Sequence, residues 1–362
     1  MHSKPSDISI SKGPDQKSPG PLDKFIKEPV TEYPNNVLNC NPLVSICVEA
    51  YQHEEYIEEC LDSLLTQQTD FEFEILLGED NSSDGTRNIC IDYAQRYPNQ
   101  IRLFLHSREN NLKVAGVASG RFNLLHNLHN ARGKFVARCE GDDYWTDLTK
   151  LQKQVRVLER DDNIMLSTTN LKQLGVEGPL DYFDKTKYFP KTVSQLEDVA
   201  LHKIRIFATC TFLMRKELVD ELVNRASEFN EILTFDWVIV YLSALRGEIH
   251  FMDECTAVYR FHQTGIMRTT SHIPHLKNLL NLDRLLVRTL PTKFSSHKKS
   301  GLYWYYDQLS YAYMQDRQLV QALKSFCQGL FSNPIRPFKN YLEHLRNFGY
   351  FVKQNLQPNE TK

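Results

Sequence analysis

The stretch LVSICV at residues 43–48 decides the fold of this chain, because it is a short, apolar, β-branched run typical of a buried parallel strand. Similar short runs follow at 73–77, 101–105 and 134–139. Between them, apolar residues recur at helical spacing over 57–65, 86–97 and 121–130. This alternation predicts an α/β fold with a mostly parallel sheet flanked by helices, in which ligands bind beyond the carboxyl ends of the strands.

The two ends of the chain differ from this central part. Seven of the 15 prolines lie in the first 42 residues, among few large apolar side chains. We therefore expect a disordered tail over 1–41 that is dispensable for folding. After a domain over 42–270, the apolar spacing becomes wholly helical, which predicts a C-terminal helical region over 271–362. We interpret that region as a cap on the core, with a docking module as the alternative.

Composition and charge exclude several classes of protein. The chain has 362 residues, and its 43 Lys and Arg nearly balance 45 Asp and Glu, so no global charge favours binding to nucleic acid. Eight cysteines without a C-x-x-C pair predict reduced thiols rather than a zinc ribbon. The sequence contains neither a secretory leader nor an apolar run long enough to span a bilayer. We expect a cytoplasmic protein without an integral membrane segment, and peripheral association with the inner membrane face stays open.

Two acidic turns follow predicted strands. The first is GEDNSSDGT at 78–86, and the second is EGDDYW at 140–145, with three carboxylates in four residues. Those carboxylates repel one another unless a cation or hydrogen-bond donors offset their charge. The second turn therefore predicts a divalent metal and phosphate site, and a solvated loop is the alternative.

Several motifs occur together and in order. VSICV at 44–48 precedes AYQ at 50–52, then EDNSSDGT at 79–86, and finally GKFVARCEGDDYWTD at 133–147 with KLQKQV at 150–155. Over about residues 43–267 the chain resembles the family-two inverting glycosyltransferases with the GT-A fold, a Rossmann-like arrangement.

The resemblance implies roles for individual residues. The turn after the first strand and Asp80 would hold the base and ribose of a nucleotide. A D-x-D-type motif, here Glu140-Gly141-Asp142 with Asp143, would bind a diphosphate through Mn²⁺ or Mg²⁺. The residues assigned to the nucleotide are Glu49, Ala50, Tyr51, Asp80, Asn123 and Asp142. The residues assigned to the metal are Asp142, Asp143 and His262.

Two later segments extend the resemblance. FDW at 235–237 opens a predicted helix where the family carries its catalytic base, which implies this role for Asp236. YRFH at 259–262 is similar to a late family segment near the leaving diphosphate, where Arg260 would assist and His262 would bind metal. The alternatives are a helix-dipole carboxylate for Asp236 and a structural role for His262.

The sequence also departs from the family pattern. Glu49-Ala50-Tyr51-Gln52 replaces the more usual Pro-Thr-Tyr-Asn, and the first acid of the D-x-D-type motif is a glutamate. At the base position Asp236 follows Phe235 rather than a second acid. Glu231 and Asp253 are the next candidate carboxylates.

The expected activity follows from the resemblance. The chain would move a sugar from a nucleotide-diphosphate donor, expected to be a UDP-sugar, to an acceptor hydroxyl with inversion, in surface polysaccharide or glycan assembly. One alternative is a sugar nucleotidyltransferase. Such an enzyme needs a Gly-rich phosphate-binding loop at the position where this chain has Ala50-Tyr51-Gln52-His53. Another is a non-catalytic protein that binds nucleotide sugars or docks a partner through its helices. The chain lacks G-x-G-x-x-G and G-x-x-x-x-G-K-[ST] loops, which argues against dinucleotide-dependent hydride transfer and P-loop phosphoryl transfer.

Overall fold

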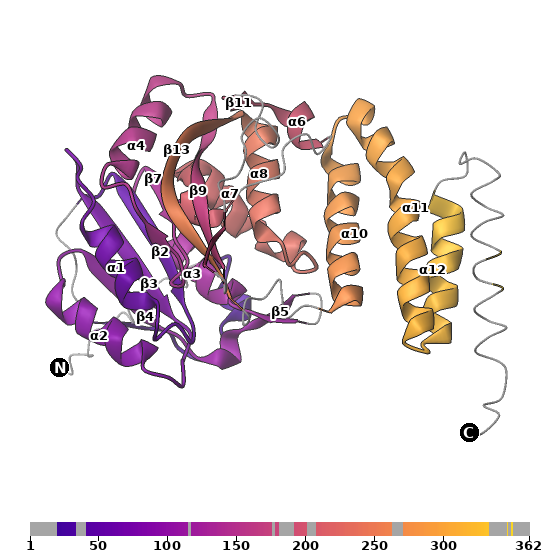
Figure 1. Ribbon diagram of the computed structural model, residues 1–362, viewed down its shortest axis with the longest axis horizontal. Coiled ribbons are helices and arrows are strands. Elements are labelled where there is room, and N and C mark those ends of the chain that lie inside the picture. Colours follow the sequence, from indigo (N-terminus) through magenta and orange to yellow (C-terminus); the bar gives the residue numbers. More distant parts are fainter. Residues whose placement is uncertain are drawn as a thin grey trace, which may run out of the picture.

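A computed structural model describes residues 20–33, 41–114, 117–175, 178–180, 192–200, 208–262 and 271–332, together with residues 346 and 349. Its central feature is a twisted sheet in the order β1-β4-β3-β2-β7-β12-β9-β13-β11 (Figure 1). The strands are β1 (Thr31–Tyr33), β2 (Val44–Ala50), β3 (Phe73–Glu79), β4 (Ile101–Leu105), β7 (Phe135–Arg138), β9 (Ile164–Gly175), β11 (Val193–Ser194), β12 (Leu213–Arg215) and β13 (Glu248–Phe261). Strands β4, β3, β2 and β7 run parallel to their neighbours in this group, as predicted.

The other half of the sheet is mixed. Strand β12 is antiparallel to both β7 and β9, while the long β13 runs parallel to β9. The short strands β8 (Tyr144–Trp145) and β10 (Gly178–Leu180) pair antiparallel with β13 and β9, and β5 (Leu112–Val114) and β6 (Val117–Ser119) form a separate hairpin. The α/β fold class and the C-terminal helices are confirmed, with an antiparallel strand inserted in the sheet.

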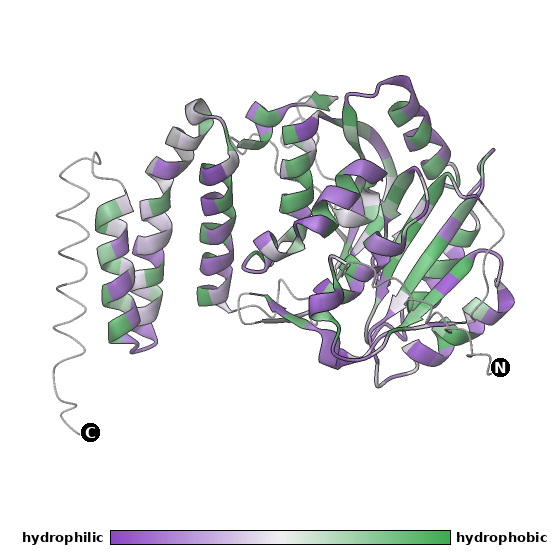
Figure 2. Ribbon diagram, turned by 180° about the vertical axis from the view of Figure 1, so that it is seen from behind, coloured by the Kyte–Doolittle hydropathy of each residue, from purple (hydrophilic) through white to green (hydrophobic). Residues whose placement is uncertain are grey.

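Helices cover both faces of the sheet. They are α1 (Ile57–Leu65), α2 (Thr86–Arg96), α3 (Arg121–Asn130), α4 (Lys150–Arg160), α6 (Leu196–Ala200), α7 (Lys216–Asn224), α8 (Phe235–Arg246), α10 (His272–Thr289), α11 (Thr292–Gln315) and α12 (Leu319–Ser332). Alternate residues of β2 point to opposite faces: Ile46 packs with α1, α2 and α4, whereas Cys47 packs with α3, α7 and α8. Figure 2 shows the apolar residues concentrated in the strands and in α8.

The C-terminal helices extend from one side of the sheet (Figure 1). Leu282 and Leu286 of α10 join the core that α8 shares with the sheet, while Leu276 and Leu280 pack with α11 and α12. The division at residue 270 stays a prediction, and α10 contributes to the cores on both sides of it. None of the helices in the described residues combines the length and apolar composition needed to cross a membrane.

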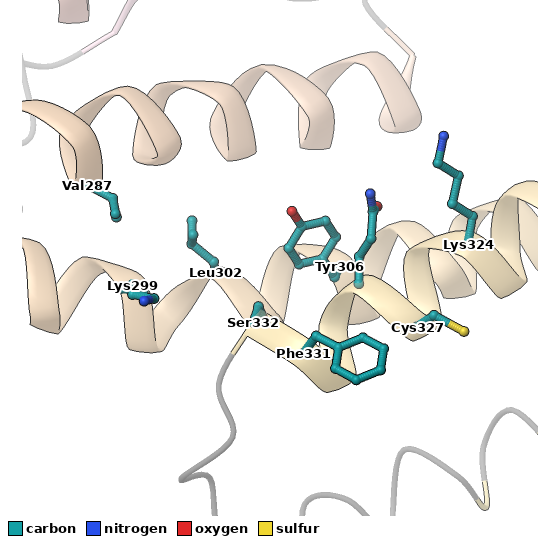
Figure 3. Close-up of a pocket in the computed structure, with 9 residues that line it drawn as sticks. Val287, Lys299, Leu302, Tyr306, Lys324, Cys327, Phe331 and Ser332 are labelled. Carbon is teal, nitrogen blue, oxygen red and sulfur yellow. The ribbon is translucent and has the colours of Figure 1, made fainter.

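A groove lies among these three helices, away from the sheet (Figure 3). Its volume is about 490 Å³, and no strand residue lines it. The lining residues are Val287, Lys299, Leu302, Tyr306, Lys324, Cys327, Gln328, Phe331 and Ser332. The groove is therefore separate from the strand ends, where the sequence predicts the functional site.

The expectation of a disordered tail over 1–41 is wrong for residues 20–33. Strand β1 pairs antiparallel with β4 at the edge of the sheet, and Leu22 is buried in the core. Asn110 further holds the segment by accepting the backbone N–H groups of Lys27 and Glu28. A short segment without apolar periodicity can fold when an existing sheet edge supplies its partners. The remaining parts of the predicted tail, 1–19 and 34–40, lie outside the described residues.

Replacing Leu22 with alanine tests this packing. Because Leu22 is only 3% exposed, we expect Leu22→Ala to lower the free energy of unfolding by about 2–5 kcal/mol in urea denaturation. The matched control is Ile26→Ala, whose side chain is 43% exposed and should change stability by less than about 0.5 kcal/mol. Equal stability of the two variants would support a dispensable tail instead.

Candidate active site

The carboxyl ends of β2, β3 and β7 meet at one edge of the sheet. Backbone hydrogen bonds join the turns that follow them: the Asp80 N–H donates to the Ala50 carbonyl at 3.0 Å, and the Gly141 N–H donates to the Glu49 carbonyl at 3.0 Å. This edge therefore brings together the two acidic turns and the turn after the first strand, as the parallel topology predicts.

Asp80 is a buried carboxylate linked to an exposed ring through Arg108. It is 2% exposed, and its Oδ2 accepts hydrogen bonds from Arg108 Nη1 at 3.1 Å and Asn111 Nδ2 at 2.8 Å. Its Oδ1 is buried without a hydrogen-bond partner within the described residues. Burial raises the pKa of Asp80 to about 6. The guanidinium of Arg108 lies 3.8 Å from the ring centroid of Tyr51, so a hydrogen-bond acceptor and a flat aromatic surface share one arginine.

Two residues in the turns around Asp80 have a strained backbone conformation. Gln52 and Asn81 both have a φ of 56°, a left-handed conformation that costs about 1–3 kcal/mol for residues other than glycine. The backbone N–H of Gln52 donates to Ser82 Oγ at 3.0 Å, and its side chain bonds Ser83, which locks the two turns together. The lock fixes the position of the neighbouring Tyr51.

Asp142 faces outward from the second acidic turn. Its Oδ2 accepts a hydrogen bond from His262 Nε2 at 2.9 Å, and His53 Nε2 lies 3.8 Å from the same oxygen. Burial alone would raise the pKa of Asp142, but the hydrogen bond from His262 and the charges of the two histidines hold it below its usual range. The same hydrogen bond raises the pKa of His262. Asp142 and His262 therefore form a hydrogen-bonded pair, and His53 lies near it without a hydrogen bond to Asp142.

Asp143 is placed differently from the metal role expected for it. It is 1% exposed, and its Oδ1 accepts the backbone N–H of Arg260 at 2.9 Å. Burial and the nearby charges of Asp142 and Glu140 raise its pKa well above the usual range. Because its carboxyl group lies in the interior, Asp143 fixes strand β13 against the turn and is not presented as a metal ligand.

Arg260 is also bonded to the second acidic turn. Its Nη1 donates to the backbone carbonyl of Asp142 at 2.7 Å, and its other terminal nitrogen pairs with Glu59. The guanidinium lies between two rings, 5.1 Å from the centroid of Tyr56 and 4.5 Å from that of Tyr144. These contacts hold Arg260 against the turn, and its contact with a diphosphate stays a prediction.

Arg138 links the end of β2 to the start of the second acidic turn. Its Nη2 donates to Glu49 Oε2 at 3.0 Å and to Glu140 Oε1 at 2.8 Å, and the guanidinium is almost fully buried. Thr209 also donates to Glu140 Oε1, at 2.5 Å. Both glutamates are therefore engaged in an internal ion-pair network.

Asp236 lies in the first turn of α8 and belongs to the same electrostatic group. Burial raises its pKa to about 6, against the opposing effects of the Trp237 backbone N–H and the charge of Arg138. Glu140 raises it further, and the buried Arg121 of α3 also interacts with Asp236 electrostatically. Asp236 is thus a partly buried carboxylate that interacts electrostatically with Glu140 of the second acidic turn, and its role as a base stays a prediction.

Two residues assigned to the nucleotide are buried instead. Ala50 and Asn123 are each 1% exposed, and Asn123 Nδ2 donates to the Gly78 carbonyl of β3 at 2.8 Å. These residues support the end of the sheet from within, and their contact with a nucleotide stays a prediction.

Sequence reasoning missed Arg108, Asn111, Arg138 and His53. Two signals could have found some of them: Arg108 and Asn111 follow a strand at the same edge, and Arg138 is a lone charge within a buried apolar strand. His53 carried no signal beyond its place after the first strand.

Comparisons with known proteins agree with this arrangement. The α/β fold is that of GT-A glycosyltransferases. A crystal structure of S. aureus TarS 1–349 in complex with UDP-GlcNAc matches it with a TM-score of 0.58 and 18% identity. The match covers 87% of this chain and 91% of that one. The mannosyltransferase PcManGT from Pyrobaculum calidifontis, solved with GDP-Man and Mn²⁺, matches with a TM-score of 0.54 and 17% identity over 94% of this chain and 93% of that one.

The sequence comparison identifies a matching family. The family described as Glycosyl transferase family 2 matches residues 45–223 of this chain. The uncharacterized protein Rv1520 of Mycobacterium tuberculosis is 33% identical over 223 residues, which is 62% of this chain and 60% of that protein. The chain therefore matches only about three fifths of the length of this relative.

Removing Arg138 tests the network that joins the turns. We expect Arg138→Met to lower the free energy of unfolding by about 3–5 kcal/mol in urea denaturation, because it leaves two largely buried carboxylates without a counter-charge. The loss should shrink at acid pH, since protonated carboxyl groups need no counter-charge.

The matched control for this variant is Arg96→Met. Arg96 pairs with Asp92 at 3.0 Å, but both side chains are at least half exposed, so its loss should cost less than about 1 kcal/mol. If the two variants were equally stable, the Arg138 network would not hold the site together.

Proposed function

We propose that this chain is a metal-assisted, inverting glycosyltransferase that moves a sugar from a UDP-sugar to an acceptor hydroxyl. The observation that carries the proposal is that the turns holding Asp80 and Asp142 meet at the strand ends, while Asp236 interacts electrostatically with Arg138 and Glu140 of the same region. The match of residues 45–223 to glycosyl transferase family 2 supports this class of reaction. Its place in surface polysaccharide or glycan assembly stays a prediction.

The surroundings of Asp80 suit the base of the nucleotide. Its Oδ1, which has no hydrogen-bond partner within the described residues, would accept the N–H of a uracil ring, while Tyr51 and Arg108 offer a surface on which that ring stacks. A hydrogen bond to a buried acceptor discriminates strongly against bases that lack the donor. The UDP-GlcNAc complex of TarS supports a uridine nucleotide.

The pair of Asp142 and His262 fits a divalent cation. Their converging carboxylate and imidazole are ligand types that Mn²⁺ accepts. The part of the chain that the structure describes holds no cluster of three or more candidate metal-ligating side chains, so oxygen atoms of the diphosphate and water would complete the coordination. A bound Mn²⁺ or Mg²⁺ supplies positive charge that stabilises the departing diphosphate. The Mn²⁺ complex of PcManGT supports this assignment.

Asp236 is the proposed catalytic base. The acceptor oxygen bonds to the anomeric carbon as the bond from that carbon to the diphosphate oxygen breaks, and the hydroxyl proton passes to Asp236. A single displacement of this kind inverts the anomeric configuration. A pKa of about 6 makes Asp236 a stronger base than an ordinary aspartate, yet leaves it ionised at neutral pH.

Substituting Asp236 with asparagine tests this role. With the active donor found from a panel of UDP-, GDP- and dTDP-sugars with Mn²⁺, we expect Asp236→Asn to lower kcat about 10²–10⁴-fold and to leave calorimetric UDP binding unchanged. In the wild type, kcat should fall as the pH drops below about 6, because protonated Asp236 cannot accept a proton.

The effect of this substitution on stability separates the two interpretations of Asp236. Its folded-state pKa is raised, so the ionised form destabilises the fold above about pH 6, and the asparagine variant should be at least as stable as the wild type at pH 7.5. A helix-dipole carboxylate would instead stabilise by about 0.3–1 kcal/mol, and its loss would leave turnover nearly normal. Turnover within a few-fold of wild type in folded protein would contradict the proposal.

The metal assignment is tested by a pair of adjacent substitutions. Titration of UDP in Mn²⁺ and in excess chelator should show that the cation strengthens binding, and Asp142→Asn should remove that gain. The isosteric control Asp143→Asn should retain it, because Asp143 is buried against Arg260. Wild-type binding that is equally tight in chelator would contradict a metal-assisted site.

A further inference from the structure

Hydrogen bonds from α10 hold the loop that leads into α8, although the bonded residues lie 45 positions apart in the sequence. Asn278 of α10 is fully buried, and its Oδ1 accepts the backbone N–H groups of Leu233 at 2.6 Å and Thr234 at 3.2 Å. Its Nδ2 donates to Thr234 Oγ1 at 3.1 Å. Thr234 itself provides no side-chain cap to α8, so Asn278 fixes the start of this helix from outside it.

Arg121 of α3 holds the other polar groups of the same loop. Its guanidinium donates to the carbonyl groups of Ile232 at 2.8 Å and Leu233 at 3.3 Å. It also lies 4.1 Å from the ring centroid of Phe235. The N–H groups of the loop therefore point to α10 and its carbonyl groups to α3, which leaves the backbone before Asp236 little freedom to move.

A second contact ties α10 to α8 further along. The hydroxyl of Tyr241, which is 1% exposed, donates to Thr289 Oγ1 at 2.5 Å. Figure 1 shows α10 beside α8, at the start of the C-terminal helices. Both helices lie beyond the region 45–223 that matches the family.

We propose that Asn278 is a positioning residue for glycosyl transfer, which sets the place of Asp236 by holding Leu233 and Thr234. This inference rests on the proposed function, in which Asp236 accepts the proton of the acceptor. Displacement of a catalytic group by about 1 Å can cost about 10²-fold in rate, so a fixed loop two residues before the base affects kcat. Helix α10, a C-terminal element, thereby belongs to the active site.

The experiment compares three variants of the full-length chain. We expect Asn278→Ala to lower kcat about 10–100-fold on the donor that the panel identifies, with KM for that donor within about twofold. Hydrogen exchange should show about tenfold faster exchange at the Leu233 and Thr234 amides and no change in β2 and β3. The control is Asn281→Ala on the same helix, which loses an exposed hydrogen bond to the Glu231 carbonyl and one from Arg284, bonds neither Leu233 nor Thr234, and should keep both readouts near wild type.

Asn278→Asp keeps an acceptor oxygen at the same place. It should restore slow exchange at the Leu233 and Thr234 amides and return kcat to within a few-fold of wild type, because that oxygen can still accept both N–H groups. This variant decides the matter if Asn278→Ala does not fold. Fast exchange at the two amides with wild-type kcat, or slow exchange with an about 10–100-fold loss of kcat, would overturn the proposal.

The remaining outcomes are distinct. Unchanged kcat and unchanged loop exchange in folded Asn278→Ala would overturn the role of Asn278. A wild-type chain that turns over none of the donors would contradict the proposed function instead. The exchange measurement alone would then decide whether Asn278 holds the loop, and unchanged protection at Leu233 and Thr234 would overturn it.

Discussion

The buried guanidinium of Arg138 is the interaction on which the site depends. It lies between Glu49, at the end of the first core strand, and Glu140, at the start of the second acidic turn, and bonds both. Without it, these carboxylates and the neighbouring Asp236 would repel one another in a region of low dielectric. The Arg138 ion pairs therefore hold the end of β2 against the turn after β7, and they offset the negative charge of the surrounding carboxylates.

With this charge offset, three aspartates in three environments can take three different roles. Asp80 is buried with one free acceptor oxygen, which suits recognition of a planar N–H donor. Asp142 is partly exposed and paired with His262, which suits a cation. Asp236 is partly buried with a raised pKa, which suits a base. The environment of each carboxylate, more than its residue type, determines what it can do.

Much of the fold could be predicted from the sequence, because buried parallel strands such as 43–48 have an apolar pattern that local reasoning detects. The position of Asp142 and Asp236 followed from the same pattern, since strand ends and helix starts are local features. The contacts of Asp143 and Arg260 could not be predicted, because adjacent residues in a turn point in different directions and only tertiary packing decides which one is exposed. Asn278 gave no local signal either, since its partners lie some 45 residues earlier in the chain.

The most direct test of this account is a crystal structure of the chain with a UDP-sugar and Mn²⁺, with the metal located by its anomalous scattering. The account predicts a metal peak bonded to Asp142 and His262, the uracil ring stacked on Tyr51 with its N–H at Asp80, and Asp236 on the side of the sugar opposite the diphosphate. A metal bound at Asp143, or a sugar whose anomeric carbon faces away from Asp236, would contradict it.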